Sequence, residues 1–328
     1  MPELLSLEIC AGGGGQALGL ETAGFRHAAV IEIEAIACET LKANRPNWNV
    51  INKDIRNFSG RGYAGVDLFA GGVPCPPFST AGRQLGETDD RDLFPAALEL
   101  IEQIKPKAVL LENVPGFAKS KFAPYRDRLI ARLRGAGYPF VDWQILNACN
   151  FGVPQLRPRF VLIALQGRAA RRFTWPQISF APLTVGETLQ DLMGSRGWRG
   201  VSAWTARANG IGPTLVGGSK LHGGPDLGPT RAKSAWRELG VDGMGIADLP
   251  PDEDFALGGS PKLTTRMTAR LQGFPDEWVF AGRKTASYRQ IGNAFPPPVA
   301  NAVGAALIRA LVGPAKPTRA LEADLAGV

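Results

Sequence analysis

Histidine is almost missing from this chain of 328 residues, which contains only His27 and His222. Neither has a companion at a suggestive spacing. Ser-His-Asp triads, Cys-His dyads and most catalytic zinc sites are therefore excluded unless one of these two residues serves. If the protein is an enzyme, its nucleophile, acid and base must mostly be other residue types.

Cysteine is also scarce, with Cys10, Cys38, Cys75 and Cys149 widely scattered. No pair has metal-ligand spacing and there is no disulfide framework, which predicts no metal site and a reducing compartment. The N-terminus lacks a basic region followed by an apolar run, and no apolar stretch looks long enough to span a bilayer. We therefore expect a cytoplasmic protein without a membrane partner.

Acidic residues are fewer than basic ones, and the net charge is +7. This excess favours a polyanionic partner, although an ordinary basic protein is the alternative. From residue 151 to 220 there are nine Arg or Lys against two acids, so a polyanion would lie against this part. The length suggests two domains, or one large and one small.

The first 165 residues alternate short apolar runs with helix-compatible segments. The runs are Leu4–Ile9 and residues 28–33, 49–51, 66–70, 108–111 and 160–165. This alternation predicts an α/β fold with a mostly parallel sheet covered on both faces. Amphipathic spacing predicts one long helix over 120–137, and helical composition returns at 299–312.

The middle of the chain has a different character. Residues 176–280 are rich in Gly, Pro and Trp and lack sustained periodicity, which predicts a separate, loop-rich domain. A disordered insertion is the alternative, but Trp198, Trp204 and Trp236 argue for a packed core. The predicted division is 1–175, 176–283, and a segment 284–328 that returns to the first domain.

A glycine-rich turn follows the first apolar run, in EICAGGGGQALGLETAGF at residues 8–25. Its glycines permit close approach of a ligand, and the following helix presents free N–H groups. The Lys-Ser/Thr of a P-loop is missing, which argues against an NTPase. Glu32 ends the second run, where doubly wound folds bind ribose hydroxyls, and Asp54 follows the third. Each could be a surface acid, but together they predict a nucleotide-like cofactor site.

Cys75 lies in GGVPCPPFS (residues 71–79), directly after an apolar run. Prolines around it are typical of a helix's first turn, where the positive end of the dipole favours a thiolate. A buried, inert cysteine is the alternative. A position at the carboxyl end of a strand favours a reactive role.

Two further motifs place polar side chains beside apolar strands. LLENV (residues 110–114) ends a strand with Glu112, whose burial should raise its pKa and let it deliver a proton near neutral pH. VPQLRPRFVLIAL (residues 153–165) brings Gln155, Arg157 and Arg159 to one side of an extended segment. The arginines would suit a phosphate or a carbonyl, with a solvated basic edge as the alternative.

These motifs, in this order, resemble the cytosine-5 DNA methyltransferase family over about residues 4–165 and 266–311. The Pro-Cys turn, Glu-Asn-Val and Gln-x-Arg-x-Arg are the most specific, and RLQGFPDEW (270–278) and YRQIGNAFPPPVANAVG (288–304) look like the family's last blocks. The resemblance implies a seven-stranded, Rossmann-like S-adenosylmethionine-dependent sheet and a smaller target-recognition domain across a cleft.

The resemblance also implies a site. S-adenosylmethionine would be the cofactor and S-adenosylhomocysteine its product. The residues expected to bind it are Cys10, Gly12, Gly13, Gly15, Glu32, Ile33, Asp54, Ile55, Pro74, Leu93 and Asn293.

By the same resemblance, Cys75 would attack carbon 6 of a cytosine flipped out of double-stranded DNA. Glu112 would act on ring nitrogen 3 and Arg159 on the carbonyl oxygen, while Arg157 would support Glu112 or the active-site loop. The expected DNA-binding residues are Ser79, Arg83, Gln84, Arg91 and Gln155. A monomer is expected, with a cognate restriction endonuclease as functional partner.

Three positions depart from the family's pattern. Pro76 replaces a glutamine, Cys10 replaces an aromatic residue, and residues 295–298 are bulkier than usual. Two other functions are compatible with the motifs: a tRNA cytosine-5 methyltransferase of the same fold and a non-catalytic DNA-binding relative. The glycine-rich middle favours DNA, and the intact Cys75, Glu112 and Arg159 favour an enzyme.

Overall fold

The computed structural model describes residues 3–74, 92–177, 183–218 and 224–313. The predicted nucleophile Cys75 and four predicted DNA-binding residues, Ser79, Arg83, Gln84 and Arg91, lie outside these ranges.

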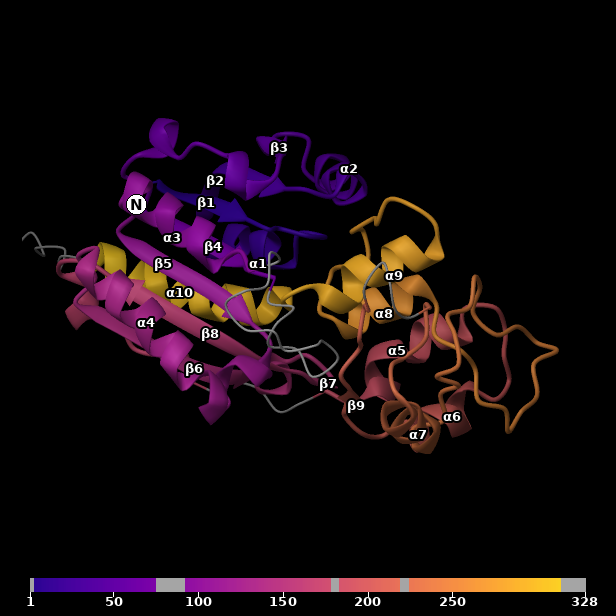
Figure 1. Ribbon diagram of the computed structural model, residues 1–328. Coiled ribbons are helices and arrows are strands. Elements are labelled where there is room, and N and C mark those ends of the chain that lie inside the picture. Colours follow the sequence, from indigo (N-terminus) through magenta and orange to yellow (C-terminus); the bar gives the residue numbers. More distant parts are fainter. Residues whose placement is uncertain (1–2, 75–91, 178–182, 219–223, 314–328) are drawn as a thin grey trace, which may run out of the picture.

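A seven-stranded sheet forms the larger part of the molecule (Figure 1). Its strands are β1 (Leu4–Ile9), β2 (Phe25–Glu32), β3 (Val50–Asn52), β4 (Leu68–Gly72), β5 (Ala108–Asn113), β6 (Phe140–Asn147) and β8 (Pro158–Leu165). The order is β3-β2-β1-β4-β5-β8-β6, and β8 runs antiparallel to both of its neighbours while the other pairs are parallel. The predicted mostly parallel α/β sheet is confirmed.

Helices cover both faces of this sheet because its strands bury both faces. Along β5, Val109 and Leu111 pack in the core beneath α3 (Phe94–Ile104) and α4 (Ala123–Gly135). The alternate residues, Ala108 and Leu110, pack on the other face. That face is covered by α1 (Gly15–Ala23) and α10 (Pro297–Val312), as Figure 1 also shows. The α-helix α2 (Ala35–Asn44) also belongs to this part.

Two sequence predictions about this part were wrong in detail. β6 was missed because it is an edge strand with several partly exposed residues, so its sequence lacks an apolar run. The long helix expected over 120–137 is a 3₁₀ turn, Ser120–Phe122, followed by α4. Pro124 lies in the first turn of α4, where proline is tolerated.

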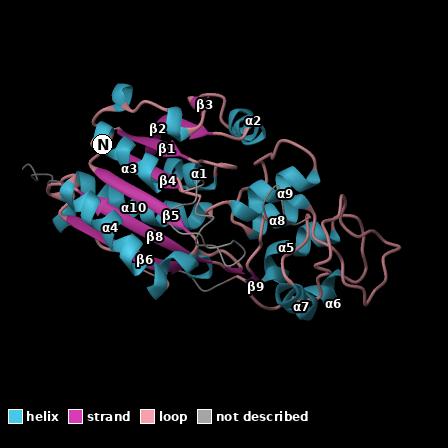
Figure 2. Ribbon diagram, viewed as in Figure 1, coloured by secondary structure: helices cyan, strands magenta, loops and turns pink. Residues whose placement is uncertain are grey.

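The smaller part is dominated by loops around three short helices, α5 (Val185–Gly194), α6 (Val201–Arg207) and α7 (Thr230–Glu238) (Figure 2). Trp198, Trp204 and Trp236 are all buried in its core, as expected for a packed region. Two residues of α8 (Thr265–Leu271) and one of α9 (Lys284–Asn293) belong to the same core. A short parallel pair, β7 (Gln155–Leu156) with β9 (Gly212–Pro213), joins this part to the sheet region.

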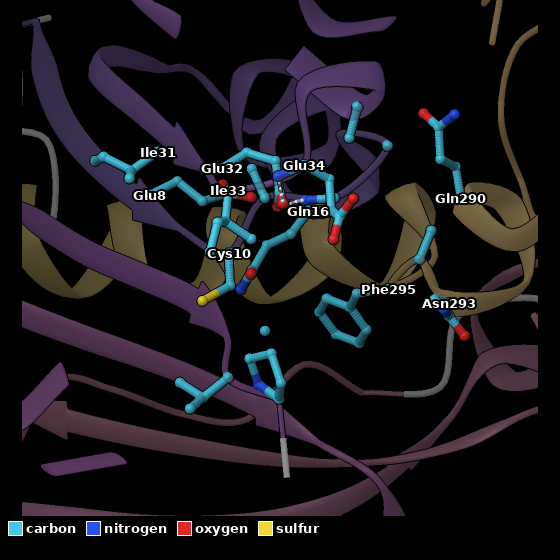
Figure 3. A pocket seen from close by; sticks show the side chains of 18 of the residues that line it. Glu8, Cys10, Gln16, Ile31, Glu32, Ile33, Glu34, Gln290, Asn293 and Phe295 are labelled. Atoms are coloured by element: carbon cyan, nitrogen blue, oxygen red, sulfur yellow. Dashed lines mark hydrogen bonds between the residues drawn. The ribbon is translucent and has the colours of Figure 1, made fainter. Parts of the chain in front are cut away.

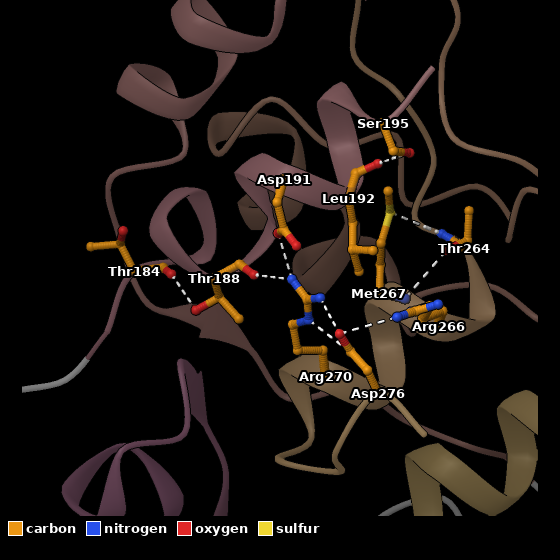
Figure 4. Close-up of polar contacts among 10 residues, drawn as sticks. All are labelled: Thr184, Thr188, Asp191, Leu192, Ser195, Thr264, Arg266, Met267, Arg270 and Asp276. Atoms are coloured by element: carbon orange, nitrogen blue, oxygen red, sulfur yellow. Dashed lines mark hydrogen bonds and ion pairs between the residues drawn. The ribbon is translucent and has the colours of Figure 1, made fainter. Parts of the chain in front are cut away.

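Polar contacts attach α5 to α8 within the smaller part (Figure 4). Arg270 of α8 donates to the Thr188 carbonyl at 3.0 Å and pairs with Asp191, both on α5, and also with Asp276. These carboxylates raise the pKa of Arg270, and Arg270 in turn lowers the pKa of Asp276 to about 2. Arg270 therefore stays charged and ties three segments together.

The C-terminal stretch Lys284–Val312 corrects one expectation. By length and composition it is apolar enough to cross a membrane. It consists of α9 and α10, however, and 56% of its most apolar 18 residues is buried inside the protein. Core helices commonly have this composition, and α10 packs against α1 and the sheet.

Candidate active site

A cavity of about 600 Å³ lies at the carboxyl ends of the parallel strands (Figure 3). Polar or reactive side chains line it in sheet order: Asp54 after β3, Glu32 at the end of β2, Cys10 after β1 and Glu112 at the end of β5. The volume suits a small organic ligand, and open α/β sheets bind ligands at this edge.

Ten of the eleven residues predicted to bind a cofactor line this cavity. They are Cys10, Gly12, Gly13, Glu32, Ile33, Asp54, Ile55, Pro74, Leu93 and Asn293. Gly15 does not line it. A side chain at Gly15 would place its Cβ 2.2 Å from the Phe295 carbonyl oxygen, so this glycine is required for packing. Its predicted contact with a cofactor therefore has no support in the geometry.

Glu32 holds the glycine turn in place. Its carboxylate accepts hydrogen bonds from the Gly12 N–H at 2.7 Å and from the Glu34 N–H at 2.8 Å. Burial raises the pKa of Glu32, an effect that these hydrogen bonds oppose. Each oxygen keeps a lone pair that can accept a further hydrogen bond from a ligand hydroxyl.

Asp54 and Cys10 differ in their charge state. The Arg56 side chain pairs with Asp54 at 2.5 Å and lowers its pKa, so Asp54 is an ionised acceptor. Burial, followed by the charges of Glu32 and Asp54, raises the pKa of the Cys10 thiol, which stays protonated. Cys10 also has a φ of 52°, in the left-handed region that non-glycine residues rarely adopt.

An ion pair closes the far end of the cavity. Arg159 Nε lies 2.9 Å from Glu112 Oε1, and each side chain is only 11% exposed. Burial raises the pKa of Glu112, as predicted from its position, while the nearby Arg159 and Arg157 act to lower it. Glu112 can therefore exchange a proton closer to neutral pH than an exposed glutamate.

Asn113, to which the sequence assigned no role, positions the segment that leads to Cys75. Its side-chain amide donates to the Val73 carbonyl at 3.0 Å. Because β4 and β5 are adjacent parallel strands, this bond fixes the chain after β4 relative to Glu112.

The model of the C-5 cytosine-specific DNA methylase family matches residues 4–215 and 227–309. The chain belongs to this family. The sequence prediction is thereby confirmed: the protein is a DNA cytosine-5 methyltransferase, and its family and fold are those of S-adenosylmethionine-dependent enzymes.

Two relatives are similar to this chain over almost its whole length. Type II methyltransferase M.NaeI of Lentzea aerocolonigenes is 56% identical over 315 residues, which is 95% of this chain and 76% of the relative. Type II methyltransferase M.NgoMIV of Neisseria gonorrhoeae is 51% identical over 318 residues, covering 94% and 98% respectively.

Solved structures share the fold at lower identity. A putative DNA modification methyltransferase from an E. coli prophage has a TM-score of 0.65 at 23% identity, over 94% of this chain and all of that one. The Dnmt2 methyltransferase of S. pombe has a TM-score of 0.63 at 19% identity, over 94% and 99%.

Arg157 of this methyltransferase was predicted to support Glu112 or the active-site loop, and that loop lies outside the described residues. Arg157 is fully buried, and its guanidinium donates to the carbonyls of Leu215 at 2.7 Å, Gly292 at 2.6 Å and Ala294 at 2.9 Å. None of its hydrogen bonds within the described ranges goes to Glu112. Arg157 influences that carboxyl through its charge alone, and its contacts join the two parts of the molecule.

Gln155 was predicted to bind DNA, and this prediction is wrong. The residue is fully buried, so DNA cannot reach its side chain. Its amide nitrogen donates to Gln272 at 2.8 Å and to the Leu271 carbonyl at 3.1 Å, and its oxygen accepts from the Leu215 N–H at 2.8 Å. Gln155 thus binds the backbone N–H of Leu215, and Arg157 binds its backbone carbonyl.

The segment after Leu215 packs against α9 without intervening side chains. A Cβ at Gly217 would lie 2.5 Å from the Arg289 carbonyl, and one at Gly292 would lie 2.4 Å from the Gly217 nitrogen. Asn293, which lines the cavity, also donates to the Gly218 carbonyl at 3.2 Å. The cavity and the smaller part of the molecule thus meet at these residues.

Proposed function

We propose that this methyltransferase binds S-adenosylmethionine in the 600 Å³ cavity and methylates a cytosine that has left the helix of double-stranded DNA. The observation that supports this proposal is that the cavity is continuous. One cavity extends from Asp54, at the β3 end of the sheet, to the Glu112–Arg159 pair at β5. A cofactor at one end and a base at the other would therefore share one site.

The donors and acceptors of the cavity fit this cofactor. Asp54 would accept from the adenine amino group, Glu32 would accept from the ribose hydroxyls, and Ile33 and Ile55 supply apolar contact. When bound, S-adenosylmethionine supplies an electrophilic methyl group. The residues of the chain orient it and shield it from water.

Glu112 and Arg159 are suited to a cytosine ring. A carboxyl with a raised pKa can hydrogen-bond to, or protonate, ring nitrogen 3, and Arg159 can donate to the carbonyl oxygen beside it. Both contacts draw electrons from the ring. They would make carbon 6 more open to attack by the Cys75 thiolate. Carbon 5 of the resulting enamine would then take the methyl group, and loss of the carbon-5 proton to a base would expel the thiolate.

Labelled methyl transfer tests this proposal. We expect transfer from labelled S-adenosylmethionine to double-stranded DNA and none to tRNA. Cys75→Ser should abolish transfer while calorimetry still detects cofactor binding. Transfer to tRNA alone would refute the DNA substrate, and near wild-type turnover of the serine variant would refute the covalent route.

We also propose that the enzyme acts as a monomer in the cytoplasm, paired with a restriction endonuclease that cuts the same sequence. The names of the two type II relatives support this pairing. Target choice is assigned to residues 176–283, and DNA contacts to Ser79, Arg83, Gln84 and Arg91. Bisulfite sequencing of plasmid DNA from expressing cells would identify the methylated site, and methylation there should block cleavage by the endonuclease.

A further inference from the structure

Arg289 has an unpaired guanidinium among the residues that the structure describes. It lies on α9, is partly buried and lines the cavity. Its Nε is buried without a hydrogen-bond partner, and within the described ranges its side chain forms no ion pair. Arg56, which also lines the cavity, pairs with Asp54, and Arg159 pairs likewise with a carboxylate, that of Glu112. Burying a charged donor without a partner is costly, so Arg289 points to an anion that arrives with a ligand.

One face of α9 forms a wall of the cavity. The residues of that face are three or four positions apart, as for side chains on one side of a helix, and they are Ala286, Arg289, Gln290 and Asn293. Figure 3 shows Gln290 and Asn293 on this helix beside the cavity. Tyr288, on another face of α9, is buried in the core of the smaller part. The packing of α9 therefore fixes which way Arg289 faces.

Arg289 also lies where the smaller part of the molecule meets the cavity. Its backbone carbonyl is so close to Gly217 that a Cβ added to that glycine would lie 2.5 Å from the carbonyl oxygen. Gly218, the next residue, lines the cavity together with Arg289. The Glu112–Arg159 pair, proposed to hold the base, lines the same cavity. DNA that contacts the smaller part while one base enters the cavity must therefore pass close to Arg289.

We propose that Arg289 is a substrate-binding residue whose guanidinium binds a backbone phosphate of the DNA at the mouth of the cavity. This rests on the proposed function of the cavity. The base that leaves the helix enters the cavity, whereas the phosphates of its strand stay at the mouth, where a partly exposed arginine can reach them. The planar guanidinium presents donors that match two phosphate oxygens at once. Arg289 thus positions the strand and leaves the reading of bases to other residues.

Arg289→Met tests this assignment, because methionine keeps much of the apolar stem and removes the charge. Duplex binding is measured in the presence of S-adenosylhomocysteine over a range of about 50 to 200 mM salt. The duplex carries the site that bisulfite sequencing identifies. We expect binding about 10- to 100-fold weaker, as for loss of a hydrogen bond between charged groups. The slope of log affinity against log salt concentration should become shallower by about 0.9, the contribution of one neutralised phosphate.

Arg26→Met is the matched control, because it removes the same charge at a distant place. Arg26 lies at the amino end of β2, whereas the cavity lies at the carboxyl ends of the strands, and it pairs with Glu3 at 2.6 Å. Its replacement should leave the salt slope and the affinity for DNA unchanged, since salt screens charges so far apart. Calorimetry with S-adenosylhomocysteine separates a phosphate contact from a cofactor contact. Arg289→Met should keep this affinity within about twofold.

Uncharged methylphosphonates in place of single phosphates locate the contact. They are introduced one at a time on both sides of the target cytosine. At one position the replacement should weaken binding by the wild-type enzyme and leave binding by Arg289→Met unaffected, because the two changes remove the same interaction. A purely structural role of Arg289 would not produce such a coupling.

The results separate this inference from the proposed function. If the wild-type protein bound no S-adenosylhomocysteine or no duplex DNA, the proposed function would fail, and this inference with it. If the wild type bound both, an unchanged salt slope for Arg289→Met, weaker binding of S-adenosylhomocysteine by that variant, or the lack of any coupled phosphate would refute the role of Arg289 alone. Should Arg289→Met not fold, Arg289→Gln provides the same comparison, because it also lacks the charge and keeps a polar side chain.

Discussion

Replacement of Arg157 by methionine should loosen the joint between the two parts of the enzyme. The guanidinium makes three hydrogen bonds of 2.6 to 2.9 Å to backbone carbonyls. Each bond from a charged donor stabilises by about 1.5–3 kcal/mol. Burial of the charge, which lowers the pKa of Arg157, offsets part of this sum. Removing one member of a buried charged network typically costs about 3–5 kcal/mol, and we expect that loss here.

Urea unfolding measures this loss in the free energy of unfolding. Urea is uncharged, so it leaves the ionic strength unchanged. A domain has about 5–15 kcal/mol of stability, so the variant should fold but unfold at markedly lower urea. With a slope of about 3 kcal/mol per molar, the midpoint should fall by about 1–1.7 M. DNA affinity should fall as well, because Arg157 and Gln155 position Leu215, the start of the segment that packs on α9.

Arg126→Met provides the comparison. Arg126 is also buried, donates to the Phe117 carbonyl at 2.7 Å and stacks over Trp143 at 4.9 Å. These contacts lie within the sheet region, so its loss should lower stability and leave DNA affinity intact. If Arg157→Met unfolded at the wild-type urea concentration, or bound DNA as tightly as Arg126→Met, the role of Arg157 at the joint would be refuted.

Three further predictions concern the cavity and the target. Burial raises the folded-state pKa of Glu8 above its ordinary value of 4.5, so the folded protein binds more protons there, and the stability of the unliganded enzyme should fall as pH rises above about 4.5. Glu8→Gln should flatten this decline in thermal melts, and an unchanged slope would contradict it. Glu112→Gln should lower the methyl-transfer rate about 10²- to 10⁴-fold in single-turnover assays; a rate within threefold of wild type would exclude proton transfer by Glu112. Exchange of residues 176–283 with those of a relative of different specificity should change the site found by bisulfite sequencing, and retention of the original site would oppose the assignment of target choice.

The sheet and the edge that lines the cavity were predictable because their signals are local. β1 has the predicted bounds, Leu4–Ile9, since a mostly apolar run that ends at a glycine turn leaves little choice of bounds. The raised pKa of Glu112 also followed from its place at the end of a buried strand. Features of this kind depend on a few neighbouring residues and on the rule that parallel strands end at one edge.

The roles of Gln155 and Arg157 could not be predicted, because distant segments decide them. Alternation correctly indicated that both side chains share one side of an extended chain. The partners on that side are Leu215, Gln272 and Gly292, which are 58 to 135 residues away from the residues that they contact. The burial of Gln16, which lines the cavity, could not be predicted for a similar reason. A glutamine in the first turn of a helix is often exposed, whereas Gln16 is buried and the C-terminal segment packs beside it, with the Phe295 carbonyl against Gly15.

The glycine contact between residues 217 and 292 has an evolutionary consequence. At this joint the chain is held through main-chain atoms, by Arg157 and Gln155 at Leu215 and by direct backbone packing at Gly217. Selection can therefore alter the side chains that follow without redesigning the catalytic scaffold, provided that residue 217 remains glycine. Such a connector would let the side chains of the smaller part change while those of the sheet region stay as they are.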